Sequence, residues 1–149
     1  MTRPLAWAVA TMFLGLGSLG VYAADEGALP LFVQSGEDFY PAAAARKLMQ
    51  GSVGLELQID DQGRAQILSH TFVDAPEFAE SASEVLKRGH FKVPEDWAQS
   101  GGPEQHFVVE VQFTIARGDA PCARKPPHVA DAEVVLVCRV QSIRRKSRL

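Results

Sequence analysis

The feature that most constrains the fold is a strict alternation of apolar and polar residues in the C-terminal half of the 149-residue chain. Every second position of residues 107–115 is apolar, and these residues are Phe107, Val109, Val111, Phe113 and Ile115. Because successive side chains of a strand point to opposite faces, this period predicts a strand with one buried face. The same period runs through residues 53–59 and, more weakly, through residues 64–73. Three such strands predict a sheet whose apolar side needs a covering layer.

Two segments carry helix signals that would supply this layer. Residues 41–50 have proline in the first turn and Gly51 at the stop. A second helix is expected after Asp74, which stands at the N-cap position of a capping-box pattern, and it is expected to end at Gly89. Its apolar residues form one stripe and are Phe78, Ala82, Val85 and Leu86. The order of elements predicts an α+β fold, a two-layer sandwich of two helices on a three-stranded antiparallel sheet.

The N-terminus has the pattern of a signal peptide over residues 1–23. Arg3 precedes an uncharged stretch that reaches Ala24, and Val21 and Ala23 fit the −3 and −1 positions of a cleavage site. The alternative is an uncleaved membrane anchor, because about 20 apolar residues are enough for one span. Both interpretations put the rest of the chain outside the cytoplasm, in the periplasm or on the periplasmic side of the inner membrane.

The chain has two cysteines, Cys122 and Cys138, and both lie in the part that is expected to be exported. Disulfides form and persist in such compartments, and two cysteines allow a single intramolecular pairing. We therefore predict a Cys122–Cys138 disulfide, with a buried free Cys138 as the alternative. The four histidines are scattered and do not stand at ligand spacing, so no metal site is expected.

Residues 39–117 resemble the C-terminal domain of the TonB energy-transducer family. The resemblance lies in the order of several short landmarks, which are Tyr40-Pro41, Gly51-Ser52-Val53, Gly63, Phe78, Ala82, Pro94 and the strand from Phe107 to Phe113. The family usually has Trp-basic-aromatic-x-Pro after the second helix. In this chain the residues 89–94 lack the tryptophan and hold the aromatic residue one place further from the proline.

The resemblance implies a periplasmic module that binds an outer-membrane transporter by pairing a sheet edge with an extended segment of it. The candidate edge is the strand of residues 107–115, with Glu110, Gln112 and Thr114 on its solvent side as the candidate selectivity residues. The lead of residues 24–38 is too short to be the family's Pro-rich spacer, so a stand-alone binding module is expected. The alternatives are a structural subunit of an envelope complex and a short TonB-like transport component anchored in the inner membrane.

Residues 118–149 form an extension outside the resemblance. Residues 133–140 are apolar and β-prone, so they could add a C-terminal strand that covers the candidate edge. Binding at that edge would then require release of the added strand. Five of the last 11 residues are basic and none is acidic. This tail is either solvated or in contact with anionic lipid or an acidic partner surface.

An enzyme is the rival class, and its candidate groups are weak. Ser69 and His70 are neighbours on a strand, so their side chains should point to opposite faces. Residues 60–61 are both aspartate and fit turn chemistry, and His90 with Asp96 forms no recognised pattern. We expect no catalytic residues and no cofactor. The net charge of −3 does not favour a nucleic-acid partner.

Overall fold

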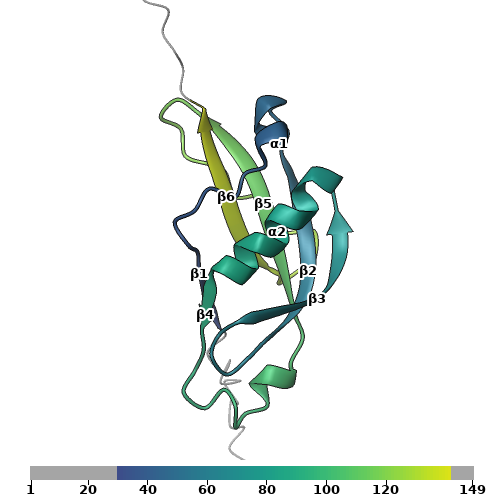
Figure 1. Ribbon diagram of the computed structural model, residues 1–149, viewed down its shortest axis with the longest axis vertical. Coiled ribbons are helices and arrows are strands. Elements are labelled where there is room, and N and C mark those ends of the chain that lie inside the picture. The colour runs from purple at the N-terminus through teal and green to yellow at the C-terminus, as the bar shows by residue number, and fades with distance from the viewer. Residues whose placement is uncertain (1–29, 142–149) are drawn as a thin grey trace, which may run out of the picture.

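The computed structural model describes residues 30–141. The predicted signal peptide, residues 24–29 of the lead and residues 142–149 of the basic tail lie outside the described residues. The described part forms an α+β fold (Figure 1). Its elements are β1 (Leu31–Val33), α1 (Ala42–Arg46), β2 (Gly51–Ile59), β3 (Ala65–Val73), α2 (Pro76–Arg88), β4 (His90–Lys92), the 3₁₀ turn η1 (Gly102–Glu104), β5 (Phe107–Arg117) and β6 (Glu133–Gln141).

The main sheet has four strands in the order β3-β2-β5-β6. The first three are antiparallel, as expected, but β6 runs parallel to β5, so the sheet is mixed rather than a three-stranded antiparallel one. The predicted C-terminal strand is therefore present and covers the outer edge of β5. Its direction follows from the connection, because residues 118–132 carry the chain back along the sheet before β6 begins.

The helices cover one face of this sheet, and α2 crosses it in Figure 1. The apolar stripe predicted for α2 is confirmed, since Phe78, Ala82, Val85 and Leu86 are all fully buried. The ring of Phe78 stacks on Phe113 of β5 at a centroid distance of 4.6 Å. The alternating apolar residues of β2 and β5 thus meet the helix stripe in one core.

Helix α1 ends four residues before the predicted boundary at Gln50. Leu48 follows it with a φ of 54°, in the left-handed region, and this conformation turns the chain toward β2. The hydroxyl of Tyr40 donates a hydrogen bond to the carbonyl of Met49, which fixes the turn from the other side.

The capping box predicted for α2 is wrong. The N-cap residue is Ala75, which makes no side-chain capping bond. The carboxylate of Asp74 instead accepts a hydrogen bond from the amide of Ser52 at 2.7 Å, and the amide of Asp74 donates to the Ser52 carbonyl at 3.0 Å. Asp74 therefore joins the end of β3 to the start of β2 rather than closing the helix.

A second, two-stranded sheet pairs β1 with β4. The sequence did not predict these two strands, because three residues are too few to show a period. The rings of Phe32 and Phe91 lie 4.9 Å apart across this pair. Gly63 of the β2–β3 turn accepts a hydrogen bond from the amide of Phe91 at 2.8 Å, and its φ of 80° suits the glycine expected there.

Candidate binding groove beside strand β6

The three candidate selectivity residues do not face solvent. Glu110, Gln112 and Thr114 are 1%, 1% and 5% exposed. Strand β5 lies between β2 and β6 and is not an edge. Residues 118–132, called the strap below, cross the sheet face that the helices leave open. The expectation that these residues form a solvent-exposed edge is therefore wrong, because the extension beyond the resemblance covers both the edge and this face.

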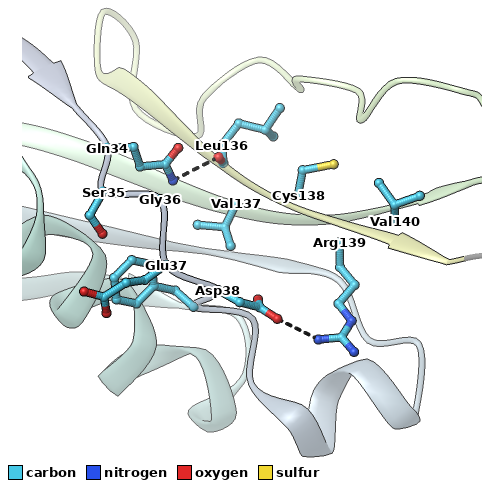
Figure 2. A pocket seen from close by; sticks show the side chains of 11 residues that line it. Gln34, Ser35, Gly36, Glu37, Asp38, Leu136, Val137, Cys138, Arg139 and Val140 are labelled. Carbon is cyan, nitrogen blue, oxygen red and sulfur yellow. Dashed lines mark hydrogen bonds and ion pairs between the residues drawn. The ribbon is translucent and has the colours of Figure 1, made fainter.

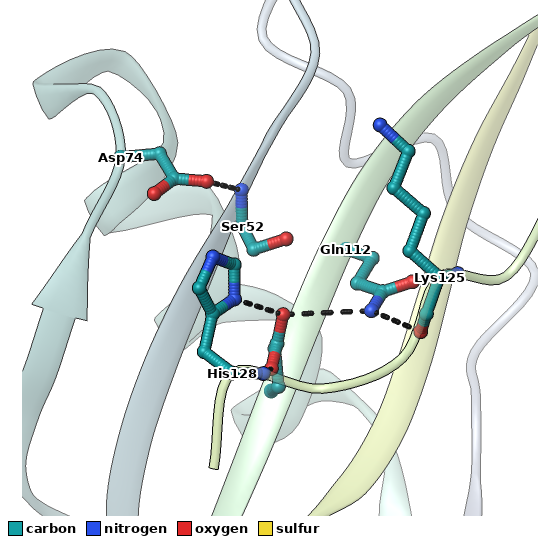
Figure 3. Close-up of polar contacts among 6 residues, drawn as sticks. Ser52, Asp74, Gln112, Lys125 and His128 are labelled. Carbon is teal, nitrogen blue, oxygen red and sulfur yellow. Dashed lines mark hydrogen bonds and ion pairs between the residues drawn. The ribbon is translucent and has the colours of Figure 1, made fainter.

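Figure 3 shows Lys125 of the strap beside Gln112 of β5. Glu110 holds the strap through a buried carboxylate. It accepts hydrogen bonds from the backbone amide of His128 at 2.7 Å and from Nδ1 of the same residue at 2.8 Å. Burial alone would raise the pKa of Glu110, but the hydrogen bonds from His128, Ser52 and Gln112 together hold that pKa below its ordinary value. The pKa of His128 is raised, chiefly by its hydrogen bond to Glu110. Glu110 and His128 thus form a charge-assisted hydrogen bond that joins β5 to the strap.

Gln112 and the disulfide hold the rest of the strap. The side chain of Gln112 donates to the carbonyl of Lys125 at 2.7 Å and accepts from its amide at 2.9 Å. The predicted Cys122–Cys138 disulfide is present and joins the strap to β6, with the two Cα atoms 5.8 Å apart. Glu110 and Gln112 therefore hold the strap rather than face an open surface, whereas the hydroxyl of Thr114 is buried and has no hydrogen-bond partner among the described residues.

The edges of the sheet are β3 and β6, and only β6 is an edge formed by the extension. A groove of about 540 Å³ runs between β6 and the segment that precedes α1 (Figure 2). We call it the β6 groove, and it is lined by residues 34–39 and 136–140. Within residues 30–141, no strand pairs with the outer side of β6.

Two contacts cross the β6 groove. The Gln34 side chain donates to the carbonyl of Leu136 at 3.2 Å, and the Arg139 guanidinium contacts Asp38 at 2.9 Å. The first contact shows that the Leu136 carbonyl points away from β5. Because backbone direction alternates along a strand, Val140 also presents its amide and carbonyl to the outer side. Both crossing contacts are exposed, so they are weak obstacles to another strand.

The residues weighed as catalytic candidates are not brought together. Ser69 contacts Glu56 at 3.4 Å, whereas His70 lies 3.2 Å from the hydroxyl of Ser83 on α2, so the two point to opposite faces as expected. Asp60 accepts hydrogen bonds from the amides of residues 62 and 64, which agrees with turn chemistry. The Ser83–His70 pair was not anticipated. Among the described residues the hydrogen bonds of the His70 ring go to the Ser83 hydroxyl and the Ala79 carbonyl and not to a carboxylate, which would be the third group of a triad.

Sequence reasoning missed the groove because its two walls are far apart in the chain. Gln34 and Leu136 are separated by 102 residues, and the pair Asp38–Arg139 by 101. A pattern of apolar residues within one segment cannot predict a contact between segments so far apart. The one available signal was the β-prone segment of residues 133–140, which indicated a new edge without indicating what lies beside it.

No protein-family model, curated protein or solved structure matches this chain. Within residues 30–141, no helix has the length and apolar character needed to cross a membrane. The same part of the chain contains no cluster of three or more His, Cys, Asp or Glu side chains suited to a metal ion.

Proposed function

We propose that this chain is an exported protein-binding module that pairs the outer edge of β6 with an extended segment of an envelope protein. An outer-membrane transporter is the partner that the resemblance to the TonB C-terminal domain suggests. The compartment would be the periplasm, and the Cys122–Cys138 disulfide is compatible with an extracytoplasmic location. The mode is β-augmentation, in which backbone hydrogen bonds supply most of the affinity.

The observation that carries the proposal is the unpaired edge of β6 beside a preformed groove. An edge strand presents a row of unpaired N–H and C=O groups that a second chain can satisfy. The groove beside it, about 540 Å³ in volume, is open to solvent along residues 136–140. An incoming strand would need to displace only the Gln34–Leu136 and Asp38–Arg139 contacts, which surface groups make.

Binding at β5 by release of β6 is the less favourable route. Strand β6 is in register with β5 from the pair Val109–Glu133 to the pair Arg117–Gln141. Its inward side chains Val135 and Val137 are 5% exposed and belong to the core. Releasing β6 would expose this apolar surface, and the disulfide would still tether the strand.

The test is a titration of isotope-labelled, oxidised protein with ten-residue peptides that copy extended periplasmic segments of outer-membrane transporters. We expect shifts of the amide resonances of residues 136–141 and slower amide exchange there. Val140→Pro removes an outward N–H from the edge and should abolish these changes, since proline cannot donate to a ladder. Val140→Thr keeps the β-branched shape and the N–H, and it should bind like the unaltered protein.

Two results would contradict the proposal. Shifts confined to β3 would mean that the opposite edge of the sheet binds. If none of the transporter-segment peptides changed the spectrum of the protein, β-augmentation would be ruled out and a structural envelope role would be favoured instead.

A further inference from the structure

We propose that the pocket at the C-terminal end of β6 selects partner segments in which an acidic and an apolar residue stand two positions apart, so that both side chains lie on the same face of the bound strand. The inference rests on the proposed function and adds to it the chemistry of the bound segment. The pocket has a volume of about 520 Å³ and continues the β6 groove, with which it shares Arg139 and Val140. We call it the terminal pocket, and its lining residues are Ala42, Ala45, Arg46, Leu48, Ile115, Arg139, Val140 and Gln141.

The charge of the terminal pocket is of one sign. Two guanidinium groups, those of Arg46 and Arg139, line it, and no carboxylate does. Arg46 has no carboxylate within 4.0 Å in the part of the chain that the structure describes. Arg139 contacts Asp38, but both side chains are exposed, at 44% and 63%. A carboxylate on an incoming strand could replace Asp38 at little cost, because exposed ion pairs are weak.

The apolar part of the terminal pocket is unusually exposed. Val140 is 63% exposed and Leu48 is 42% exposed. Leu48 also has a φ of 54°, a region that leucine rarely adopts and that glycine would occupy without strain. A strained backbone that keeps an apolar side chain at a pocket mouth is a reason to look for a ligand there. Leu48 provides a surface for one apolar side chain beside the two arginines, whereas the side chain of Val140, which follows Arg139 in β6, points to the other face of the sheet.

An extended acidic segment fits this pocket better than the chain's own tail does. The residues that follow Gln141 include Arg144, Arg145, Lys146 and Arg148 and contain no acidic residue. Like charges would oppose their insertion between Arg46 and Arg139. A strand paired with β6 would pass the pocket at the end of the groove, where its side chain could reach both arginines.

The probe is a set of ten-residue peptides of alternating serine and threonine, acetylated and amidated so that their ends carry no charge. One contains Glu-Thr-Val at its centre, and the others carry Gln-Thr-Val or Glu-Thr-Ser at the same place; they are called the Glu-Val, Gln-Val and Glu-Ser peptides after the two positions that share a face. Titration of the oxidised protein, followed by the amide resonances of β6, measures each dissociation constant. We expect the Gln-Val and Glu-Ser peptides to bind about tenfold more weakly than the Glu-Val peptide.

Variants assign the effect to the pocket. Arg139→Glu should reverse the preference so that a Lys-Val peptide binds better than Glu-Val, and Arg46→Gln should weaken Glu-Val alone. Leu48→Ser should bring Glu-Val to the level of Glu-Ser. Lys47→Gln is the matched control, because Lys47 is an exposed neighbouring cation that does not line the pocket, and it should leave all dissociation constants nearly unchanged.

The outcomes separate the two proposals. Equal binding of the Glu-Val and Gln-Val peptides would overturn the acidic preference and leave pairing along β6 intact. A Gln-Val peptide made with a free C-terminus is the last probe, and if it alone bound tightly it would also overturn the preference, because the pocket would then take a terminal carboxylate. No binding of any peptide, together with none in the transporter-segment titration, would overturn both proposals.

Discussion

The two faces of the main sheet are covered in different ways. On one face, Phe113 and the other apolar side chains of β2 and β5 pack against α2 in a core without charged groups. On the other face, the strap covers Glu110 and Gln112, which hold it by hydrogen bonds, and the disulfide joins it to β6. Both faces of β5 are buried, but only the first is buried by apolar contact.

This difference predicts different sensitivities. Apolar burial is proportional to the area removed from water and depends little on pH or redox conditions. The strap depends on the disulfide, the two hydrogen bonds of Glu110 to His128 and the two hydrogen bonds of Gln112 to Lys125. Conditions that remove a charge or a disulfide should therefore loosen the strap and leave the helix-covered face packed.

The largest effect is expected for Phe113→Ala on the helix-covered face. Phe113 is fully buried, stacks on Phe78 and meets Tyr40 edge-on at 5.7 Å. Truncating such a ring should lower the free energy of unfolding by about 3–5 kcal/mol. Denaturant unfolding measures this loss of stability. Leu68→Ala, at an exposed apolar position, is the control and should cost far less. A loss no larger than the control's would contradict the assignment of this face as the main source of stability.

The next effect concerns the disulfide. Replacing Cys122 and Cys138 together by serine opens a loop of about 15 residues and should lower stability by about 3 kcal/mol. Reduction of the unaltered protein should have a similar effect, measured as the shift of the denaturation midpoint. Amide exchange should rise most in the strap. If exchange rose equally under α2, the two faces would not be independent.

A smaller loss is expected for Glu110→Gln. The amide would turn N–H groups toward the His128 donors, so buried hydrogen bonds would be lost at a cost of about 1–3 kcal/mol. Glu95→Gln, at an exposed position, is the control and should change stability very little. Equal unfolding free energies for the two variants would show that Glu110 does not hold the strap.

The smallest effect is the pH dependence of the Glu110–His128 pair. The pKa of Glu110 is lowered, so its contribution is present above the ordinary value of 4.5 and is lost as pH falls through the folded-state pKa. The pKa of His128 is raised, so its contribution is full below 6.5 and is lost as pH rises through the folded-state pKa. The stability advantage of the unaltered protein over His128→Asn should therefore be largest between pH 4.5 and 6.5.

Because the His128 side chain is 55% exposed, this advantage should not exceed about 1 kcal/mol. Chemical unfolding of both proteins at pH 5.5 and pH 8.5 measures it. The contact between the rings of His128 and Phe72, 4.5 Å apart, adds a part that does not change with pH. An advantage that grew from pH 5.5 to pH 8.5 would have the wrong sign and would contradict the pairing.

Sequence patterns predicted the helix-covered face well because it follows periodic rules. The stripe of α2 and the alternation of β2 and β5 both report which side of an element is apolar. The strap-covered face obeys no such rule. Alternation marks Glu110 and Gln112 as polar, but it does not distinguish a polar residue in water from one that bonds a loop. The partner of Asp74 was missed for a related reason, since Ser52 lies 22 residues away and no local motif connects them.

The candidate site was predictable only in part. The β-prone character of residues 133–140 indicated a strand that could cover the edge of β5, and that strand is present as β6. Its parallel direction and the wall supplied by residues 34–39 depend on how the strap returns the chain, which the composition of the strap does not encode. The groove is a product of tertiary arrangement rather than of any one segment.

The parallel direction of β6 also decides where the two ends of the described chain leave the domain. Pro30 lies near Glu133 at the start of β6, whereas Gln141 ends the same strand beside α1. At about 3.3 Å per residue, the eight steps of β6 separate these exits by about 26 Å. An attachment to a surface at one exit would let β6 point away from that surface, and the groove could then be reached from every side. Attachments at both exits would lay β6 along the surface, and the groove would then admit only segments that run in the plane of that surface.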